Sequence, residues 1–557
     1  KPGEKKVVEL SELARADNAG GSLVHEGFSF ELTNNPSWLA VKSLPYLMEY
    51  PHECTEQIVN RYFANQLSST IINKNPGLRK VFDAWQADPD ALTSTLALNQ
   101  DLKQAILEET PWVREAEDET KQRERLAILF DLNRLAAEQE STLAKLEQRQ
   151  RNDGAFSWFP GGPENRYMTQ YVAEGLTRLV ELDALEGDIG ERTQSMTLRT
   201  LDFLDYKMVE DYKKLLNRLK KEKDRQAYQP SSIIVHYLYI RSAYLQEREL
   251  SGEAKAAWDY FRGRARAHWV KYGLYEQALL ASAFSRVDQP AGKEIIESLR
   301  ERAIRKDEFG MYWKYPSGWS WQQLPIETHC RIQEAFLRNG GTQAEMDDMR
   351  LYLLANKRTN RWETTKATAA AVYALLQTGT DWTSDVQSVD VSFPRLKSAL
   401  YQTELASAQS GAEAGTGYYR VQYAKDKVTP DFAQVKLKNK EKTIAWGGMY
   451  WQFTQDIDAV EASENGPLSL QRRLFRRINT EEGERLEEIS ADKPMQPGER
   501  LVVQLVVKTD RDMDYVHLKD RRAAGLEPTE QLSGYRYESG LGFYFSPDDL
   551  AVHFFFA

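Results

Sequence analysis

The spacing of apolar positions divides the chain into a helical middle region and two flanking regions of β character. Between about residues 36 and 379, apolar residues recur at the spacing of one helix face, as at Tyr167 and Tyr171. Breaks with glycine or proline separate these stretches, which predicts about a dozen helices joined as short antiparallel pairs. The first 33 residues look extended. After residue 382, apolar and polar residues alternate, as in residues 501–508, which predicts strands.

Three turns inside the helical region share a glycine or asparagine that is soon followed by an aromatic residue. They are Gly154-Ala-Phe156, Gly310-Met-Tyr-Trp313 and Asn360-Arg-Trp362. Such turns resemble the connecting loops of α/α toroids, in which helical hairpins surround a central axis. An irregular helical bundle is the alternative, because glycine next to an aromatic residue is common in a chain with 13 Trp and 27 Tyr.

The order of these regions predicts the domains. One β domain can draw strands from both sides of a helical insertion when the ends of that insertion lie close together. We therefore predict a helical domain at residues 35–380, inserted in a β domain formed by residues 1–34 and 381–466. Residues 467–557 are predicted to form a β-sandwich. It stops on apolar strand residues, so we expect it to be truncated.

Composition narrows the classes of function. The 557 residues carry a net charge of −10, which argues against a nucleic-acid surface. No apolar run reaches the ~20 residues of a membrane helix. No His-x-x-x-His, Cys-x-x-Cys or glycine-rich phosphate loop is present, so we expect neither a metal nor a cofactor. The two cysteines leave a single Cys54–Cys330 disulfide open. The chain begins at Lys1 without a signal-peptide pattern, so we expect a piece of a longer protein.

The strongest chemical signal is the segment Tyr50-Pro-His-Glu-Cys54-Thr-Glu-Gln57. Proline favours the start of a helix, so we predict Cys54 in the first turn, with Gln57 three residues later on the same face. A helix N-terminus favours a thiolate. Attack of the sulfur on the Gln57 side-chain amide, with loss of ammonia, would give an intramolecular thioester. Apolar bulk against water would come from nearby side chains, namely Trp38, Tyr46, Leu47 and Tyr50. A buried core cysteine on an ordinary helix is the alternative.

The motif and its surroundings resemble a known family. Cys-x-Glu-Gln preceded by Tyr-Pro is similar to the thioester motif of bacterial alpha-2-macroglobulins, and residues 35–47 and 362–371 look like parts of that family's thioester domain. Residues 153–162 are similar to the loop that the family places beside the reactive bond. Vertebrate relatives carry glycines around the cysteine, where this chain has Glu53 and Thr55.

The resemblance covers most of the chain and implies a multidomain fold. An all-α α/α-toroid thioester domain would be inserted in an all-β CUB-like domain and followed by a macroglobulin-type β-sandwich. The implied function is that of an endopeptidase inhibitor, which traps proteases and tethers their lysine amines through the Cys54–Gln57 thioester, once per molecule and without turnover. Partners would be the target proteases and the N-terminal macroglobulin domains of the full-length protein. The implied location is the periplasm or cell envelope, with any membrane anchor in the missing N-terminal part.

The resemblance also names supporting residues. Glu56 and Tyr50 belong to the motif, and Asn165 is the closest match to the asparagine of amine-preferring members. Complement-type members carry a catalytic histidine near that position, and residues 163–168 contain none. The implied acyl acceptor is therefore an amine.

Two other functions stay open. A thioester adhesin or opsonin would fasten to surfaces, although glycan targets would call for the missing histidine. An α/α-toroid glycosidase or terpenoid cyclase would need a reusable acid/base pair, and the Asp-x-Asp-Asp acid of cyclases is absent. Among weaker candidates, His52 could tune Cys54. His329 and Cys330 are adjacent, but neighbours point apart on a helix, which favours a plain buried thiol at Cys330.

Overall fold

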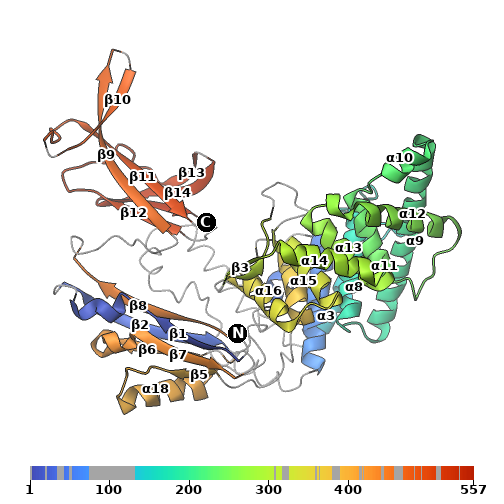
Figure 1. Ribbon diagram of the computed structural model, residues 1–557, viewed down its shortest axis with the longest axis horizontal. Helices are drawn as coiled ribbons and strands as arrows, with labels where there is room; N and C mark the ends of the chain where they lie inside the picture. The colour runs from blue at the N-terminus through green and yellow to red at the C-terminus, as the bar shows by residue number, and fades with distance from the viewer. Residues whose placement is uncertain are drawn as a thin grey trace. The chain divides into compact units, whose positions relative to one another are not determined.

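The computed structural model (Figure 1) describes residues 3–18, 22–33, 40, 43–48, 50, 53–74, 132–306, 309–315, 325–357, 361–362, 364–378, 389–412, 417, 419–440, 445–456, 468–481, 483–490, 492–509, 516–538 and 540–556. Trp38, Pro51, His52 and Asn360 lie outside this part. Two units separate near Phe453. The first holds the helices, two three-stranded sheets and a short hairpin formed by β3 (Ile304–Lys306) and β4 (Gly310–Tyr312), and the second holds two further sheets.

The helical region of the first unit consists of helices that bury part of their surface, except for the short helix Glu222–Ala227, which has no buried residue. They are α2 (Leu44–Met48), α3 (Thr55–Lys74), α7 (Leu132–Arg149), α8 (Arg166–Glu181), α9 (Gly187–Arg218), α10 (Glu222–Ala227), α11 (Ser232–Ser242), α12 (Gly252–His268), η4 (Trp269–Lys271), α13 (Leu274–Val287), α14 (Gln289–Glu301), α15 (Pro325–Arg338), α16 (Gln343–Ala355) and α17 (Thr365–Thr378). Side-chain caps fix several boundaries, such as Thr342, which forms a capping box at the start of α16. The helical periodicity of the sequence is confirmed in this region.

Six of these helices contact one another in a closed cycle that follows the chain order. α3 contacts α8, α8 contacts α11, α11 contacts α13, α13 contacts α15, α15 contacts α17, and α17 contacts α3 again. Other helices contact members of this cycle: α7 contacts α3, α9 contacts α8, and α14 contacts α13. Buried apolar side chains such as Val172 and Leu280 form the cores between them. These contacts therefore connect the helices into one packed region.

Glycine turns allow two of the loops to pack closely against helices. Gly154 has a φ of 86° and Gly310 a φ of 67°. A Cβ added to either would overlap a backbone carbonyl, of α9 at Gly154 and of α16 at Gly310. Only glycine combines the positive φ with so close an approach. The aromatic residues Phe156, Trp313 and Trp362 that follow the three turns are all buried.

The two three-stranded sheets of the first unit join distant parts of the chain. One has the order β1 (Lys5–Glu9), β7 (Gln434–Asn439), β5 (Val389–Ser392), and the other β6 (Tyr419–Ala424), β2 (Val24–Thr33), β8 (Trp446–Thr454). Val8 pairs with Val435 and Phe30 with Val421. Strands that precede the helices therefore share sheets with strands that follow them. The Phe28 ring packs at 4.9 Å from the Phe432 ring, between centroids, in their apolar core.

One helix in this β region departs from the sequence pattern. Helix α18 (Ala399–Ser410) lies where we expected strands only, and it buries Leu405. Its residues are mostly good helix formers, and helix propensity is the physical reason for the difference. The alternation that predicts strands is local to β5, β6 and β7 and does not extend through residues 399–410.

The second unit is formed by two antiparallel sheets. One has the order β10 (Gly483–Glu488), β9 (Leu468–Thr480), β11 (Arg500–Thr509), and the other β12 (Val516–Arg521), β15 (Ala551–Phe556), β14 (Leu541–Pro547), β13 (Gly534–Glu538). Phe545, Ala551 and Phe555 are buried. The Arg472 Nε lies 2.7 Å from Asp520 Oδ1, an ion pair that links β9 to β12.

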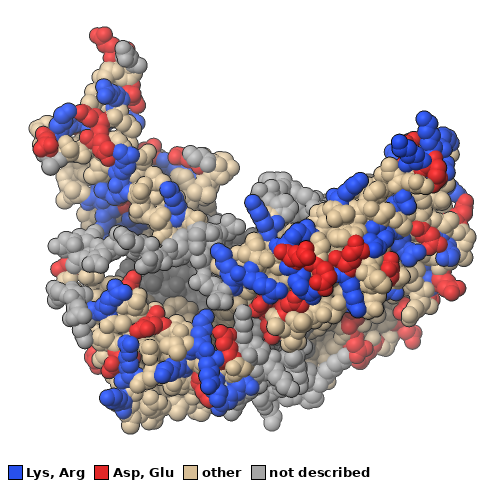
Figure 2. All heavy atoms as spheres, viewed as in Figure 1, with Lys and Arg blue, Asp and Glu red and all other residues tan. Residues whose placement is uncertain are grey.

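Several properties of the described residues limit the chemistry that they could carry out. Basic and acidic side chains are interleaved over the helices on the face drawn in Figure 2. None of the described helices combines the length and the apolar character needed to cross a membrane. Within the same residues, no group of three or more His, Cys, Asp or Glu side chains is arranged to hold a metal ion. Cys54 and Cys330 are both buried and form no disulfide.

Candidate functional site

Cys54 occupies the cap position at the N-terminus of α3. The helix begins at Thr55, and the Ile58 N–H donates to the Cys54 carbonyl oxygen at 3.0 Å as the first intrahelical hydrogen bond. The prediction that Cys54 lies in the first turn is therefore wrong by one residue. The physical reason lies in the Thr55 N–H, which donates to the carbonyl of Trp158 at 3.0 Å and starts the helix there.

Gln57 turns its side chain back toward Cys54. Its Oε1 accepts a hydrogen bond from the Cys54 backbone N–H at 3.2 Å. A bond from the third helical residue to the cap N–H is one half of a capping box, in which Ser or Thr at the cap usually supplies the other half. Here the cap residue carries a thiol. The bond thus brings the Gln57 acyl group to the residue that carries the sulfur nucleophile.

A loop between α7 and α8 holds the start of α3. The Thr55 hydroxyl donates to the Ser157 carbonyl at 2.6 Å, in addition to the bond from its N–H to Trp158. Ser157 and Trp158, within residues 153–162, therefore lie against Thr55, the residue after Cys54. Because both contacts are made by backbone carbonyls of the loop, the loop conformation sets the position of the cap residue.

Burial decides the protonation state of Cys54. The residue is 9% exposed, and desolvation raises the pKa of its thiol. Backbone hydrogen bonds from Gln57 and Glu56 to the sulfur oppose this shift, the charge of Glu56 adds to it, and the charge of Arg149 opposes it weakly. The expectation that the helix N-terminus favours a thiolate is therefore wrong, because desolvation of the charged form outweighs the helix dipole. Burial thus favours the thiol over the thiolate, and a base would assist attack by the sulfur.

Glu56 faces the sulfur of Cys54. The Cys54 Sγ donates to Glu56 Oε2 at 4.0 Å. Oε1 accepts from Asn60 Nδ2 at 2.5 Å and from the Thr365 hydroxyl at 2.9 Å. Burial raises the pKa of Glu56, while these donors and the charge of Lys366 oppose the shift. Helices α3 and α17 together place a buried carboxyl group at the thiol.

Tyr50 and Asn165 have structural partners. The Tyr50 ring meets the Tyr46 ring edge to face at 5.6 Å between centroids, and its carbonyl accepts from Arg61 Nη2 at 2.6 Å. Asn165 caps α8, where its Oδ1 accepts from the Met168 N–H at 2.8 Å. Tyr50 thus contributes apolar bulk near the motif, whereas the amide of Asn165 is engaged at a helix terminus.

Sequence reasoning missed the residues that hold Glu56. Thr365 and Lys366 begin α17, and Thr365 lies 309 positions from Glu56 along the chain. Asn60 is one turn further along α3, and its Oδ1 accepts from the Tyr171 hydroxyl at 2.8 Å. No spacing rule brings residues so far apart together. The one available signal was the resemblance of residues 362–371 to a thioester domain, which named no role for them.

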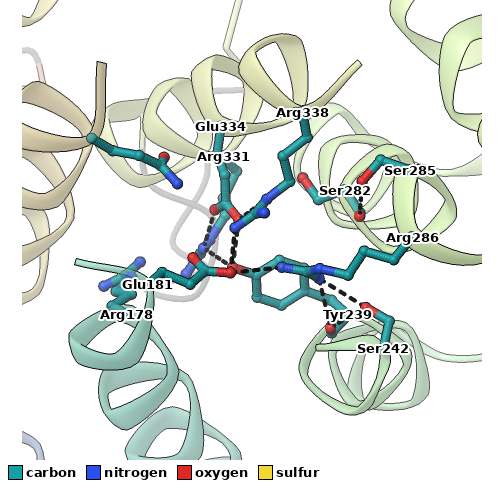
Figure 3. Close-up of polar contacts among 12 residues, drawn as sticks. Arg178, Glu181, Tyr239, Ser242, Ser282, Ser285, Arg286, Arg331, Glu334 and Arg338 are labelled. Carbon is teal, nitrogen blue, oxygen red and sulfur yellow. Dashed lines mark hydrogen bonds and ion pairs between the residues drawn. The ribbon is translucent and has the colours of Figure 1, made fainter. Parts of the chain in front are cut away.

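A second buried polar cluster ties the helices of the cycle together. Glu181 from α8 accepts from Arg286 of α13 at 2.8 Å, and Arg338 of α15 reaches the same carboxylate at 2.5 Å (Figure 3). Glu334 accepts from the Tyr239 hydroxyl of α11 at 2.8 Å and from Arg338 at 2.9 Å. Four helices of the cycle thus share one network. Its charges are mutually paired, so removal of one partner would leave a charge uncompensated, and the network offers no nucleophile.

His329 and Cys330 are core residues. The Tyr315 hydroxyl lies 2.7 Å from His329 Nδ1, and His329 Nε2 lies 2.9 Å from the Met349 carbonyl oxygen. Burial lowers the pKa of His329 to about 4 and raises that of Cys330. The interpretation of Cys330 as a plain buried thiol is confirmed.

Comparison with known proteins identifies the second unit. Residues 468–556 match the family model of the bacterial alpha-2-macroglobulin MG10 domain. A comparison with curated proteins gives no match. Similar solved structures include a mutant of Salmonella alpha-2-macroglobulin (14% identity, TM-score 0.38), native Escherichia coli alpha-2-macroglobulin (15%, 0.35) and the Escherichia coli protein activated by porcine elastase (14%, 0.39). The alignments cover 100% of this chain and 30%, 29% and 41% of those chains, so this chain spans less than half of their length.

The MG10 match extends from the start of β9 to the end of β15. A macroglobulin-type domain was predicted in this part of the sequence, and the match confirms that one is present. The whole chain is multidomain, with a helical part and β-sheet parts. The chain therefore carries, at residues 468–556, a domain of the bacterial alpha-2-macroglobulin MG10 type.

Proposed function

We propose that Cys54 and Gln57 form an intramolecular thioester and that the chain is the covalent-capture part of a protease trap. Formation joins the Cys54 Sγ to the Gln57 Cδ and releases ammonia. An amine that later attacks the same carbon forms an amide and frees the thiol. Each molecule reacts once, so the chain acts as an inhibitor and not as an enzyme with turnover.

The observation that carries this proposal is the return of the Gln57 side chain to the cap of α3. The 3.2 Å bond between Gln57 Oε1 and the Cys54 N–H holds the acyl group at the nucleophilic residue. Proximity of this kind converts an unfavourable encounter into an intramolecular step. Burial of Cys54 at 9% exposure supports the proposal further, because a thioester persists only where water is kept away.

The proposed architecture assigns a role to each part of the chain. The helical region is proposed to be an α/α toroid that carries the thioester, and the closed cycle of α3, α8, α11, α13, α15 and α17 supports this assignment. The sheets that contain β1 and β2 are proposed to form a CUB-like domain into which the toroid is inserted. The pairing of β2 with β6, on the other side of the helices in sequence, supports this assignment.

The proposed biological setting follows from the family. A protease that attacks the whole protein would be enclosed by it, and the uncovered thioester would acylate a lysine amine of that protease. The N-terminal macroglobulin domains of the same protein would be partners of this chain. We place the protein in the periplasm or at the cell envelope, where foreign proteases would be met.

Methylamine tests this proposal directly. We expect it to add to Gln57, identified by peptide mapping, and to release one titratable thiol per molecule. The control is Cys330→Ala, which removes the other cysteine and leaves the labelling unchanged, whereas Cys54→Ala abolishes it. Labelling that survives Cys54→Ala, or the absence of labelling in freshly purified protein, would refute the thioester.

A further inference from the structure

Glu56 is the titratable group that meets the sulfur in this site. Its Oε2 accepts from the Cys54 Sγ at 4.0 Å, and the residue lies between the two proposed thioester partners in sequence. Its Oε1 is held by Asn60 and Thr365, from α3 and α17. The carboxyl group therefore has one oxygen fixed by two donors and the other directed at the thiol.

A base would assist the chemistry of this site. Burial favours the thiol form of Cys54, whose proton must leave before or as the sulfur attacks. Burial also raises the pKa of Glu56, which makes its carboxylate a stronger base than an exposed one. A group with a pKa moved toward neutrality both takes and returns a proton well.

Charged and titratable groups from four elements interact with Glu56. They are Cys54 at the cap of α3, Tyr46 from α2, Tyr167 and Tyr171 from α8, and Lys366 from α17. Burial raises the pKa of each of these tyrosines. Lys366 is buried as well, and burial lowers its pKa, partly offset by nearby carboxylates. Its charge opposes the upward shift of the Glu56 pKa.

We propose that Glu56 is the catalytic proton-transfer residue of the Cys54–Gln57 acyl-transfer reaction. This inference rests on the proposed thioester. In formation, Glu56 takes the proton of the Cys54 Sγ, the sulfur bonds to the Gln57 Cδ, and Glu56 returns the proton to the leaving nitrogen, which departs as ammonia. In capture, an amine nitrogen bonds to the same carbon, Glu56 accepts its proton and delivers it to the departing sulfur. The products are an amide and a thiol, without any oxidant or reductant.

The arrangement also explains why a carboxyl group serves where residues 163–168 offer no histidine. The group that moves the proton lies on α3 itself, next to the sulfur, and needs no contribution from the loop that carries Asn165. A carboxylate accepts a proton readily from an attacking amine, which loses it easily once the new bond has formed. A hydroxyl attacks weakly unless its proton is removed first, which calls for a stronger base.

Glu56→Gln is the decisive variant, because glutamine keeps the acceptor oxygen for Asn60 and Thr365 but cannot carry the proton. The matched control is Glu53→Gln, which removes an exposed carboxylate three positions away that pairs with Lys145. Two quantities are measured in the whole chain: the fraction with thioester, by intact mass, and the rate of methylamine addition across pH. Glu56→Asp is the second variant, since it keeps a proton carrier but withdraws it from the sulfur.

We expect Glu56→Gln to lower the rate of thioester formation or of methylamine addition by on the order of 100-fold or more, while Glu53→Gln behaves as wild type. In wild type the rate falls more steeply with falling pH once Glu56 becomes protonated. In Glu56→Gln only the slope due to protonation of methylamine remains. Methylamine addition to Glu56→Asp should be slower than to wild type but should keep the additional pH dependence. This variant tests the role of Glu56 if Glu56→Gln fails to fold.

The failures of the two proposals are distinguishable. Wild-type protein without a thioester overturns the proposed function and this inference together. Wild-type protein with a thioester, accompanied by Glu56→Gln and Glu56→Asp variants of unchanged rate and pH profile, overturns the inference about Glu56 alone.

Discussion

The loop that holds the start of α3 depends on a glycine whose replacement has a calculable cost. Gly154 has a φ of 86°, and an added Cβ would overlap the Arg199 carbonyl oxygen of α9. Gly161, in the same loop, has a φ of 73°, but an added Cβ there would meet nothing within 4 Å. Gly161→Ala therefore measures the conformational penalty alone, and Gly154→Ala adds the steric overlap to it.

The left-handed conformation costs an L-residue about 1–2 kcal/mol, and this is the expected loss of unfolding free energy for Gly161→Ala. Relief of the overlap in Gly154→Ala requires a backbone shift, and overpacking of this kind adds about 1–3 kcal/mol. We therefore expect Gly154→Ala to be the more destabilised variant by about 1–3 kcal/mol. Because Phe156 is buried two residues later, the loop has little freedom to absorb the shift.

Urea unfolding followed by far-UV circular dichroism, at a wavelength dominated by helices, measures this difference for the helical region. The slope with urea should be equal in the two variants, so that their midpoints can be compared. Gly154→Ala should also react differently with methylamine from Gly161→Ala, because the displaced loop contacts Thr55. Equal unfolding free energies for the two variants would refute the close packing of the Gly154 turn on α9.

Three further predictions concern the buried charges and the selectivity of the site. Glu174→Gln leaves Arg178 and Arg331 buried without the carboxylate that pairs with both, and should lower the unfolding free energy at neutral pH by about 3–5 kcal/mol; an unchanged urea midpoint would contradict it. Despite burial, these arginines hold the pKa of Glu174 well below its usual range, so its stabilising contribution is present above the ordinary glutamate value of about 4.3 and is lost as pH falls below it. Wild-type stability should therefore drop in acid more than that of Glu174→Gln, and parallel pH curves would count against the pairing. Asn165→Ala should cost about 1 kcal/mol as a lost helix cap and leave the preference for methylamine over glycerol intact; glycerol labelling equal to that by methylamine, in either protein, would assign hydroxyl chemistry to the site.

The sequence pattern predicts the elements better than it predicts their ends and partners. Helical spacing predicts α8 and α13, and alternation predicts β11, because burial of one face imposes a period on the residues. Helix α18 was not predicted, because its residues favour a helix but form no marked apolar stripe. The start of α3 was misplaced by one residue because Thr55 binds the carbonyls of Ser157 and Trp158, which the local sequence does not reveal.

The candidate site was predictable only in its local part. Cys54 and Gln57 are three residues apart, so their proximity follows from the geometry of a helix terminus. The shift of the Cys54 pKa was predicted in the wrong direction, since burial depends on the whole fold. Likewise, the contact of Thr365 with Glu56 arises from the packing of α17 on α3, which no local pattern encodes.

Intact mass spectrometry of freshly purified, untreated protein tests the central claim most directly. The thioester predicts a mass lower than that of the sequence by one ammonia, with a cross-linked peptide that joins Cys54 to Gln57, and with Cys330 as the single titratable thiol after denaturation. A mass equal to that of the sequence, together with two free thiols and an unmodified Gln57, would contradict the account.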